Sequence, residues 1–167
     1  LAELLRAQID FARLPGLMAG GHIKGLAVTA SSYGSGEHAT FYQSDTVVEP
    51  WIRHQRLAMR CELTHAHLLA SSAIPFVFPA VPLHGPRGLA YYGDGAMRQT
   101  APVSPAIHLG AQRLLVIGAG RTHEPQVPVV DTLSYPSLAQ IAGHSLSSIF
   151  LDALPADVER LRRINRT

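Results

Sequence analysis

The stretch Gly88-Leu-Ala-Tyr-Tyr-Gly-Asp-Gly-Ala-Met-Arg98 decides how the rest of the chain is interpreted. Its apolar and aromatic first half predicts a strand over Leu89–Tyr92, followed by a turn in which Gly93 and Gly95 flank Asp94. Asp-Gly is a strong turn dipeptide, because glycine adopts positive φ freely and aspartate hydrogen-bonds its own backbone. A carboxylate on a glycine-flanked loop after a strand is also a common way to hold a catalytic base. Asp94 is therefore either an ordinary turn residue or an active-site base.

Further strands are expected on both sides of this stretch. Leu26–Ala30 is a short apolar run that predicts a buried strand, and after the turn Tyr33–Glu37 the chain is expected to return as a second strand over His38–Gln43. Val81–Leu83 and Leu89–Tyr92 are expected to pair as a hairpin. Leu114–Ile117 predicts a buried strand of the parallel kind.

Helical patterns separate these strands and indicate a layered α/β sheet. Thr64 is expected to cap a helix that runs to Ala73, and Ser104 with Pro105 predicts another that stops at Gly110. The other expected helices are one that ends at Leu14-Pro15-Gly16, one that follows Ser137 to Phe150, and one over Asp157–Ile164. Trp51–Arg60 is expected to be a solvated loop or helix face, with contact to anionic lipid headgroups or nucleic acid as the alternative.

Three blocks in unbroken order carry a resemblance to a known family. They are Ala70-Ser-Ser-Ala-Ile-Pro-Phe-Val-Phe-Pro79, Tyr92-Gly-Asp-Gly-Ala96 and Pro102-Val-Ser-Pro-Ala-Ile-His-Leu-Gly-Ala111. Together they resemble the C-terminal part of the patatin-like phospholipases. The resemblance runs from about Leu1 to Arg166 and implies a three-layer α/β/α fold with a mainly parallel central sheet. Residues 1–167 would then be one partial domain.

The resemblance also implies a mechanism. In this family an aspartate in an Asp-Gly-Gly or Asp-Gly-Ala motif pairs with a serine in a two-residue catalytic dyad, and Asp94 is the matching position. The family's nucleophile lies in a Gly-x-Ser-x-Gly elbow upstream of its aspartate, and neither this elbow nor the glycine-rich oxyanion loop is present. We therefore expect an upstream segment of the same polypeptide to supply the serine, and the present chain alone to be inactive.

The implied substrates are lipid acyl esters, and no cofactor is implied. Phe76, Val77, Phe78 and Leu83 are candidates to line an acyl pocket, with core packing as the alternative. Contact with a membrane surface is expected to be peripheral, which suits a cytoplasmic or membrane-surface location. The alternative function is a catalytically inactive domain of the same fold that acts as a membrane-associated or regulatory partner.

A second candidate nucleophile lies in Gly143-His-Ser-Leu-Ser147, which resembles the nucleophile elbow of α/β-hydrolases without its last glycine. An elbow needs a strand before the serine, whereas the residues from Ser137 to Gly143 have helical spacing. No histidine follows Ser145, although the hydrolase order is serine, acid, histidine. Ser145 is therefore expected to be a small residue in a packed helix.

Composition excludes several other classes of function. The net charge of +2 is too small to indicate nucleic-acid binding, and no apolar run reaches the roughly 20 residues of a transmembrane helix. Cys61 is the only cysteine, so no disulfide can form within the chain. His65 and His67 are two residues apart on an expected helix and do not share a face, so we expect no metal site. Charged residues make up only 16%, which fits a chain that buries much of its surface or meets lipid.

Overall fold

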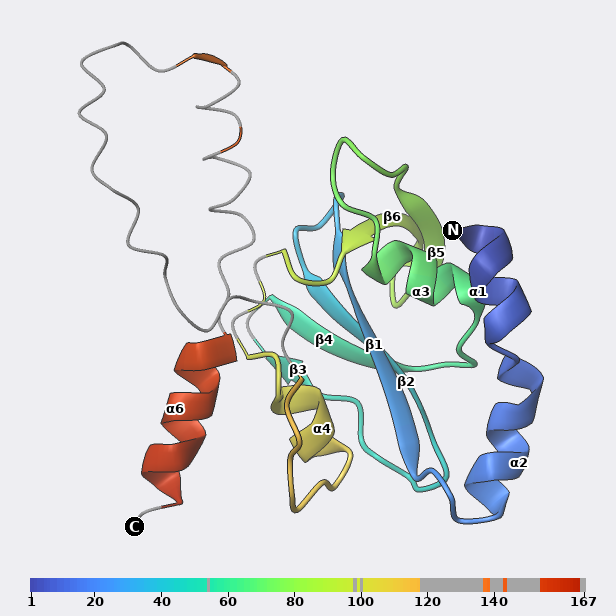
Figure 1. Cartoon of the computed structure of the whole chain (residues 1–167), viewed down its shortest axis with the longest axis vertical. Helices are drawn as coiled ribbons and strands as arrows, with labels where there is room; N and C mark the ends of the chain where they lie inside the picture. Colours follow the sequence, from blue (N-terminus) through green and yellow to red (C-terminus); the bar gives the residue numbers. More distant parts are fainter. Residues whose placement is uncertain are drawn as a thin grey trace.

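The computed structural model describes residues 1–53, 55–97, 99, 101–117, 137–138, 143 and 154–165. These residues form a mixed α/β structure, as the sequence predicts, around a sheet with the strand order β3-β4-β2-β1-β6-β5 (Figure 1). The strands are β1 (Gly25–Ser32), β2 (His38–Ser44), β3 (Ile52–Arg53), β4 (Arg56–Arg60), β5 (Val81–Gly85) and β6 (Gly88–Asp94).

The expectation of a mainly parallel sheet is wrong for the described strands. β2 and β4 pair in parallel, whereas β1–β2, β1–β6, β3–β4 and β5–β6 all pair antiparallel. The reason is local, because short turns join β1 to β2 and β5 to β6, and a short turn can connect only antiparallel neighbours. Both of these hairpins are confirmed predictions.

Helices lie on both faces of the sheet. Their bounds are α1 (Ala2–Gln8), the 3-10 helix η1 (Phe11–Arg13), α2 (Leu14–Ala19), α3 (His65–Ser71), α4 (Ser104–His108) and α6 (Leu154–Ile164). Thr64 caps α3 as predicted, and Gly110 adopts a φ of 89° just after α4. Leu14-Pro15-Gly16 opens α2 instead of ending a helix, because proline fits the first helical turn. Within the described ranges, every helix is too short or too polar to cross a lipid bilayer.

The main core lies between the sheet and α3. α3 contacts β1, β5 and β6, and eight buried residues form one cluster on this side of the sheet. They are Val28, Ala30, Ala39, Phe41, Leu63, Ala70, Leu83 and Tyr92. Phe41 is fully buried and meets the rings of His67 and Tyr92 edge-on.

The opposite face of the sheet is covered by α4 and the segment before it. Trp51 is stacked between Tyr42 of β2, with ring centroids 5.4 Å apart, and His108 of α4, at 4.3 Å. Trp51 thereby joins the helix to the sheet. The segment that carries it was expected to be a loop or helix face and instead forms β3 and β4. Its basic residues are the reason for that error, since strand edges tolerate charged side chains.

Three further predictions have different outcomes. Leu114–Ile117 is not a strand, and the side chains of Leu115 and Ile117 are each 88% exposed. The helix expected from Ser137 to Phe150 lies largely outside the described residues. The helix expected from Asp157 is confirmed as part of α6, although Ile164 is exposed there and does not point inward.

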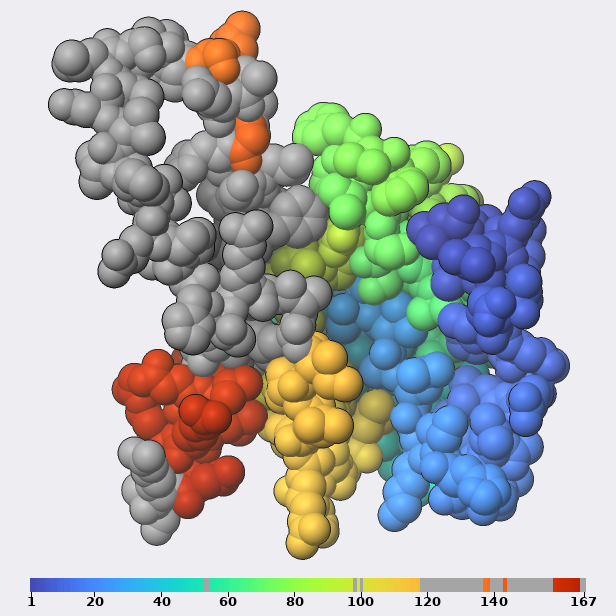
Figure 2. All heavy atoms as spheres, in the orientation of Figure 1, coloured from blue at the N-terminus to red at the C-terminus, as the bar shows by residue number. Residues whose placement is uncertain are grey.

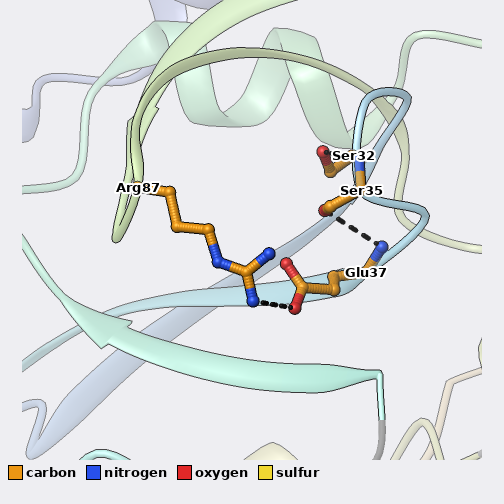
Figure 3. Close-up of polar contacts among 4 residues, drawn as sticks. All are labelled: Ser32, Ser35, Glu37 and Arg87. Atoms are coloured by element: carbon orange, nitrogen blue, oxygen red, sulfur yellow. Dashed lines mark hydrogen bonds and ion pairs between the residues drawn. The ribbon is translucent and has the colours of Figure 1, made fainter.

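The tips of the two hairpins are tied together (Figure 3). Arg87, in the β5–β6 turn, donates to Glu37 at the start of β2 across 3.0 Å, and the hydroxyl of Ser35 accepts the Glu37 N–H at 3.3 Å. The hydroxyl of Ser32 accepts the N–H of Ser35. Arg87 is 80% exposed, so this ion pair fixes the relative position of the hairpins more than it stabilises the fold.

Candidate functional site

Asp94 is the last residue of β6 and lies where that strand leaves the sheet. It pairs with Ala30 of β1, and its N–H donates to the carbonyl of Ala73 at 3.0 Å. The next N–H, from Gly95, donates to the carbonyl of Ser71 at 3.1 Å. These bonds attach the loop to the C-terminal end of α3, so the backbone that carries the carboxylate is fixed on two sides.

Asp94 is half-buried as a residue, and its carboxylate makes an aspartate turn. Its Oδ1 accepts the N–H of Ala96 at 2.7 Å. Within the described residues no second hydrogen bond to this carboxylate is found, and an ionised carboxylate can accept several. The geometry satisfies the ordinary turn interpretation and leaves acceptor capacity that a hydroxyl could use.

The glycines around Asp94 are needed because the backbone of neighbouring strands comes very close. A Cβ added at Gly95 would lie 2.2 Å from the carbonyl oxygen of Thr29, and one at Gly93 would lie 2.4 Å from the hydroxyl of Tyr33. The first neighbour is backbone and cannot move aside, whereas the second is the end of a side chain. The close approach of this loop to β1 therefore requires a residue without a side chain most strictly at Gly95.

Two buried polar side chains support the loop from the other face of the sheet, and neither was singled out from the sequence. His38 of β2 donates from Nε2 to the carbonyl of Gly95 at 2.8 Å, and Ser31 of β1 donates to the carbonyl of Met97 at 3.0 Å. Burial lowers the pKa of His38, although its bond to Gly95 acts in the opposite direction. The alternation of β2 could have revealed that His38 shares a face with Thr40, but not that Gly95 meets it.

The buried His67 and the half-buried Cys61 form a separate pair. His67 accepts the N–H of Thr64 at Nδ1, 3.1 Å away, which places its ring proton on Nε2, 3.7 Å from the Cys61 sulfur. Burial lowers the pKa of His67 and raises the pKa of Cys61, so both groups are favoured in their neutral forms. His65 points elsewhere and donates to the carbonyl of Ile9. No group of three potential metal ligands occurs in the part of the chain that the structure describes.

The candidate acyl-pocket residues do not gather in one place. Phe76 is 98% exposed and has a φ of 66°, whereas Leu83 is buried in the core beneath α3. Val77 and Phe78 are also exposed. The core interpretation therefore holds for Leu83 alone, and the other three form an exposed apolar turn.

Comparison of the chain with known protein families, curated proteins and solved structures finds no match. The site must therefore be interpreted from its own geometry. The competing nucleophile, Ser145, lies outside the described residues.

Proposed function

We propose that this chain is the acid-bearing part of a lipid acyl hydrolase that uses a Ser-Asp dyad, as in patatin-like phospholipases. Asp94 is the base, and an upstream segment of the same polypeptide supplies the serine. The observation that carries the proposal is the fixed position of Asp94, whose flanking N–H groups are bonded to Ala73 and Ser71 while its carboxylate keeps acceptor capacity. An ordinary surface turn does not need this anchoring.

In the proposed reaction the serine oxygen attacks the ester carbonyl while Asp94 accepts the hydroxyl proton. The tetrahedral intermediate collapses, the alcohol leaves with that proton, and an acyl-enzyme remains. Asp94 then takes a proton from water, which attacks the acyl group; the bond from the acyl carbon to the serine oxygen breaks, and the serine oxygen leaves with that proton as the fatty acid is released. A free aspartate has a pKa of about 3.9 and is a weak base at pH 7, so position and oxyanion stabilisation must compensate. No cofactor is required.

The proposal includes the three-layer patatin fold. Helices on both faces of the sheet, α3 on one and α4 on the other, support it (Figure 1). The parallel strands of such a fold would have to extend the sheet beyond the strands described here. Contact with a membrane surface would be peripheral.

The test is hydrolysis of p-nitrophenyl butyrate and of phospholipid by the polypeptide that includes the serine, with Asp94→Asn beside the unmodified protein. We expect loss of at least about 100-fold in kcat, the lower range for a general base, with unchanged melting, because asparagine can still accept the Ala96 N–H. Asp10→Asn is the matched control, since Asp10 also accepts an N–H two residues ahead, from Ala12. Equal activity in the Asp94 variant would contradict the assignment.

The second candidate function is an inactive domain of the same fold that contacts a membrane. The exposed apolar turn around Phe76 favours it, because exposed aromatic residues bind the interface of a bilayer. This function predicts no ester hydrolysis even with the upstream serine present. It also predicts that the protein sediments with anionic vesicles and that Phe76→Ser reduces the sedimented fraction. Hydrolysis that depends on Asp94 would exclude it.

A further inference from the structure

One edge of β1 lacks a neighbouring strand over most of its length. β1 pairs with β2 from Gly25 to Ser31, but β6 pairs only with Ala30, Ser31 and Ser32. The N–H of Asp45 donates to the carbonyl of Lys24, and the N–H of Ser32 donates to the carbonyl of Glu37. These two bonds, one at each end of the pair, show which residues of β1 direct their backbone groups towards β2.

In an antiparallel pair, alternate residues direct their backbone groups to the same neighbour. Leu26, Val28 and Ala30 therefore bond to β2, whereas Gly25, Ala27 and Thr29 direct their N–H and C=O groups to the open side. No partner for these three N–H groups is found in the described residues.

This open edge forms the floor of a groove of about 650 Å³. One wall is α3, through Leu68 and Ser71, and the other is α4 and the residues around it, including Pro105, Ala106 and Leu109. Figure 1 looks onto this edge, with β1 in front and the two helices on either side, and in Figure 2 blue atoms lie between the green α3 region and the amber α4 region. A slot with a backbone floor and apolar walls fits an added β-strand.

The segment Leu114–Ile117 has the properties of the missing strand. It consists of four apolar residues, and its exposure alternates, with Leu114 and Val116 at 37% and 39% but Leu115 and Ile117 at 88%. An apolar run exposed in this way is unfavourable in water. A strand between two helices needs apolar side chains on both of its faces, which such a continuous run provides.

The connection to the groove is short enough. Leu109 lies beside Gly25, since a Cβ added at Gly25 would be 3.5 Å from the Leu109 side chain, and Gly110 and Ala111 line the groove themselves. From there the segment would run along β1 from Gly25 towards Thr29, parallel to it. Four residues of strand span about 13 Å, which matches the open edge.

We propose that the groove along β1 binds the chain's own segment Leu114–Ile117 as a parallel strand. Docking satisfies the backbone groups of Gly25 and Ala27 and the N–H of Thr29, whose carbonyl already lies against Gly95, and buries Leu115 and Ile117 between α3 and α4. The inference does not depend on the proposed hydrolase activity. It extends the sheet on the side next to Asp94, because Thr29 also touches Gly95.

Amide hydrogen exchange, followed by NMR on the chain at several concentrations, tests the proposal. We expect the amides of Gly25, Ala27 and Thr29 to be protected like those of Leu26, Val28 and Ala30, which serve as internal controls. Leu115→Asp should lower the protection of the first three by about tenfold or more. The controls should keep theirs, which shows that the variant still folds. Leu89→Asp, at another exposed leucine, should change neither set.

Three results would overturn the proposal. Rapid exchange of the three open-edge amides in the unmodified chain would show an empty groove. Protection that Leu115→Asp leaves intact would assign the groove to another segment. Protection that rises with protein concentration, together with dimers in sedimentation, would assign it to a second copy of the chain.

Discussion

At the scale of the residue, the loop around Asp94 depends on contacts with strands far away in sequence. Gly95 lies against the carbonyl of Thr29, its own carbonyl accepts the Nε2–H of His38, and its N–H donates to Ser71. Each contact restricts the backbone next to the carboxylate. A weak base such as a carboxylate gains most from such restriction, because it must accept the proton of the serine hydroxyl at one defined position.

Gly95→Ala should displace this loop. The added Cβ would be 2.2 Å from a backbone oxygen of β1, so either the strand or the loop must shift, at a cost of about 1–3 kcal/mol in unfolding free energy. Urea unfolding measures the cost, and loss of ester hydrolysis in the complete polypeptide would report the displaced carboxylate. Gly34→Ala is the control, because nothing lies within 4 Å of its added Cβ. Equal stability of both variants would contradict the close packing at Gly95.

At the scale of the element, α4 is too short to be stable by itself. It has five residues, Ser104–His108, and isolated helices of that length do not form in water. Stacking of Trp51 on His108 and on Tyr42 connects it to the sheet. One side chain next to a two-residue edge strand thus stabilises a helix distant in sequence.

Trp51→Ala should release α4 from the sheet. Two aromatic pairs of about 0.5–1.5 kcal/mol each are lost in addition to buried area, so the unfolding free energy should fall by at least about 1–3 kcal/mol. The amides of α4 should exchange faster while those of β1 stay protected, as hydrogen exchange would show. Phe76→Ala removes an aromatic side chain that is already exposed and should have no effect. Unchanged exchange in α4 would indicate that other contacts hold it.

At the scale of the whole molecule, each face of the sheet buries one histidine in its neutral form. His38 lies on the α4 side and His67 on the α3 side, and burial lowers the pKa of both. A proton added to His67 would occupy Nδ1, which accepts the Thr64 N–H that caps α3. Protonation of these histidines at low pH therefore destabilises the packing on both faces of the sheet.

The chain should lose stability as the pH falls below about 6.5, the pKa of histidine in the unfolded state. Below that value the unfolded chain binds more protons than the folded one, so stability increases with pH, by at most about 1.4 kcal/mol per pH unit for each histidine. Urea unfolding from pH 5 to 8 measures this slope. His38→Gln and His67→Gln should each flatten it, and His22→Gln, at an exposed histidine, is the control for the substitution itself. A slope of opposite sign would contradict neutral burial.

The sequence by itself determined the local elements. Short apolar runs on either side of turn residues predicted both hairpins, Thr64 predicted the start of α3, and Asp-Gly predicted the turn at Asp94, because each depends on neighbours within a few residues. Short turns also require antiparallel pairing of the strands they join, so the pairing within both hairpins was predictable from the sequence. The expectation of a mainly parallel sheet came instead from the family resemblance.

Only the tertiary structure decided what surrounds those elements. The support of Gly95 by His38 and Thr29 joins residues distant in the chain, and the open edge of β1 depends on where β6 stops pairing with it. Sequence periodicity specifies which face of an element is apolar but not which element covers it. That choice is made by packing and backbone hydrogen bonding among all the strands and helices at once.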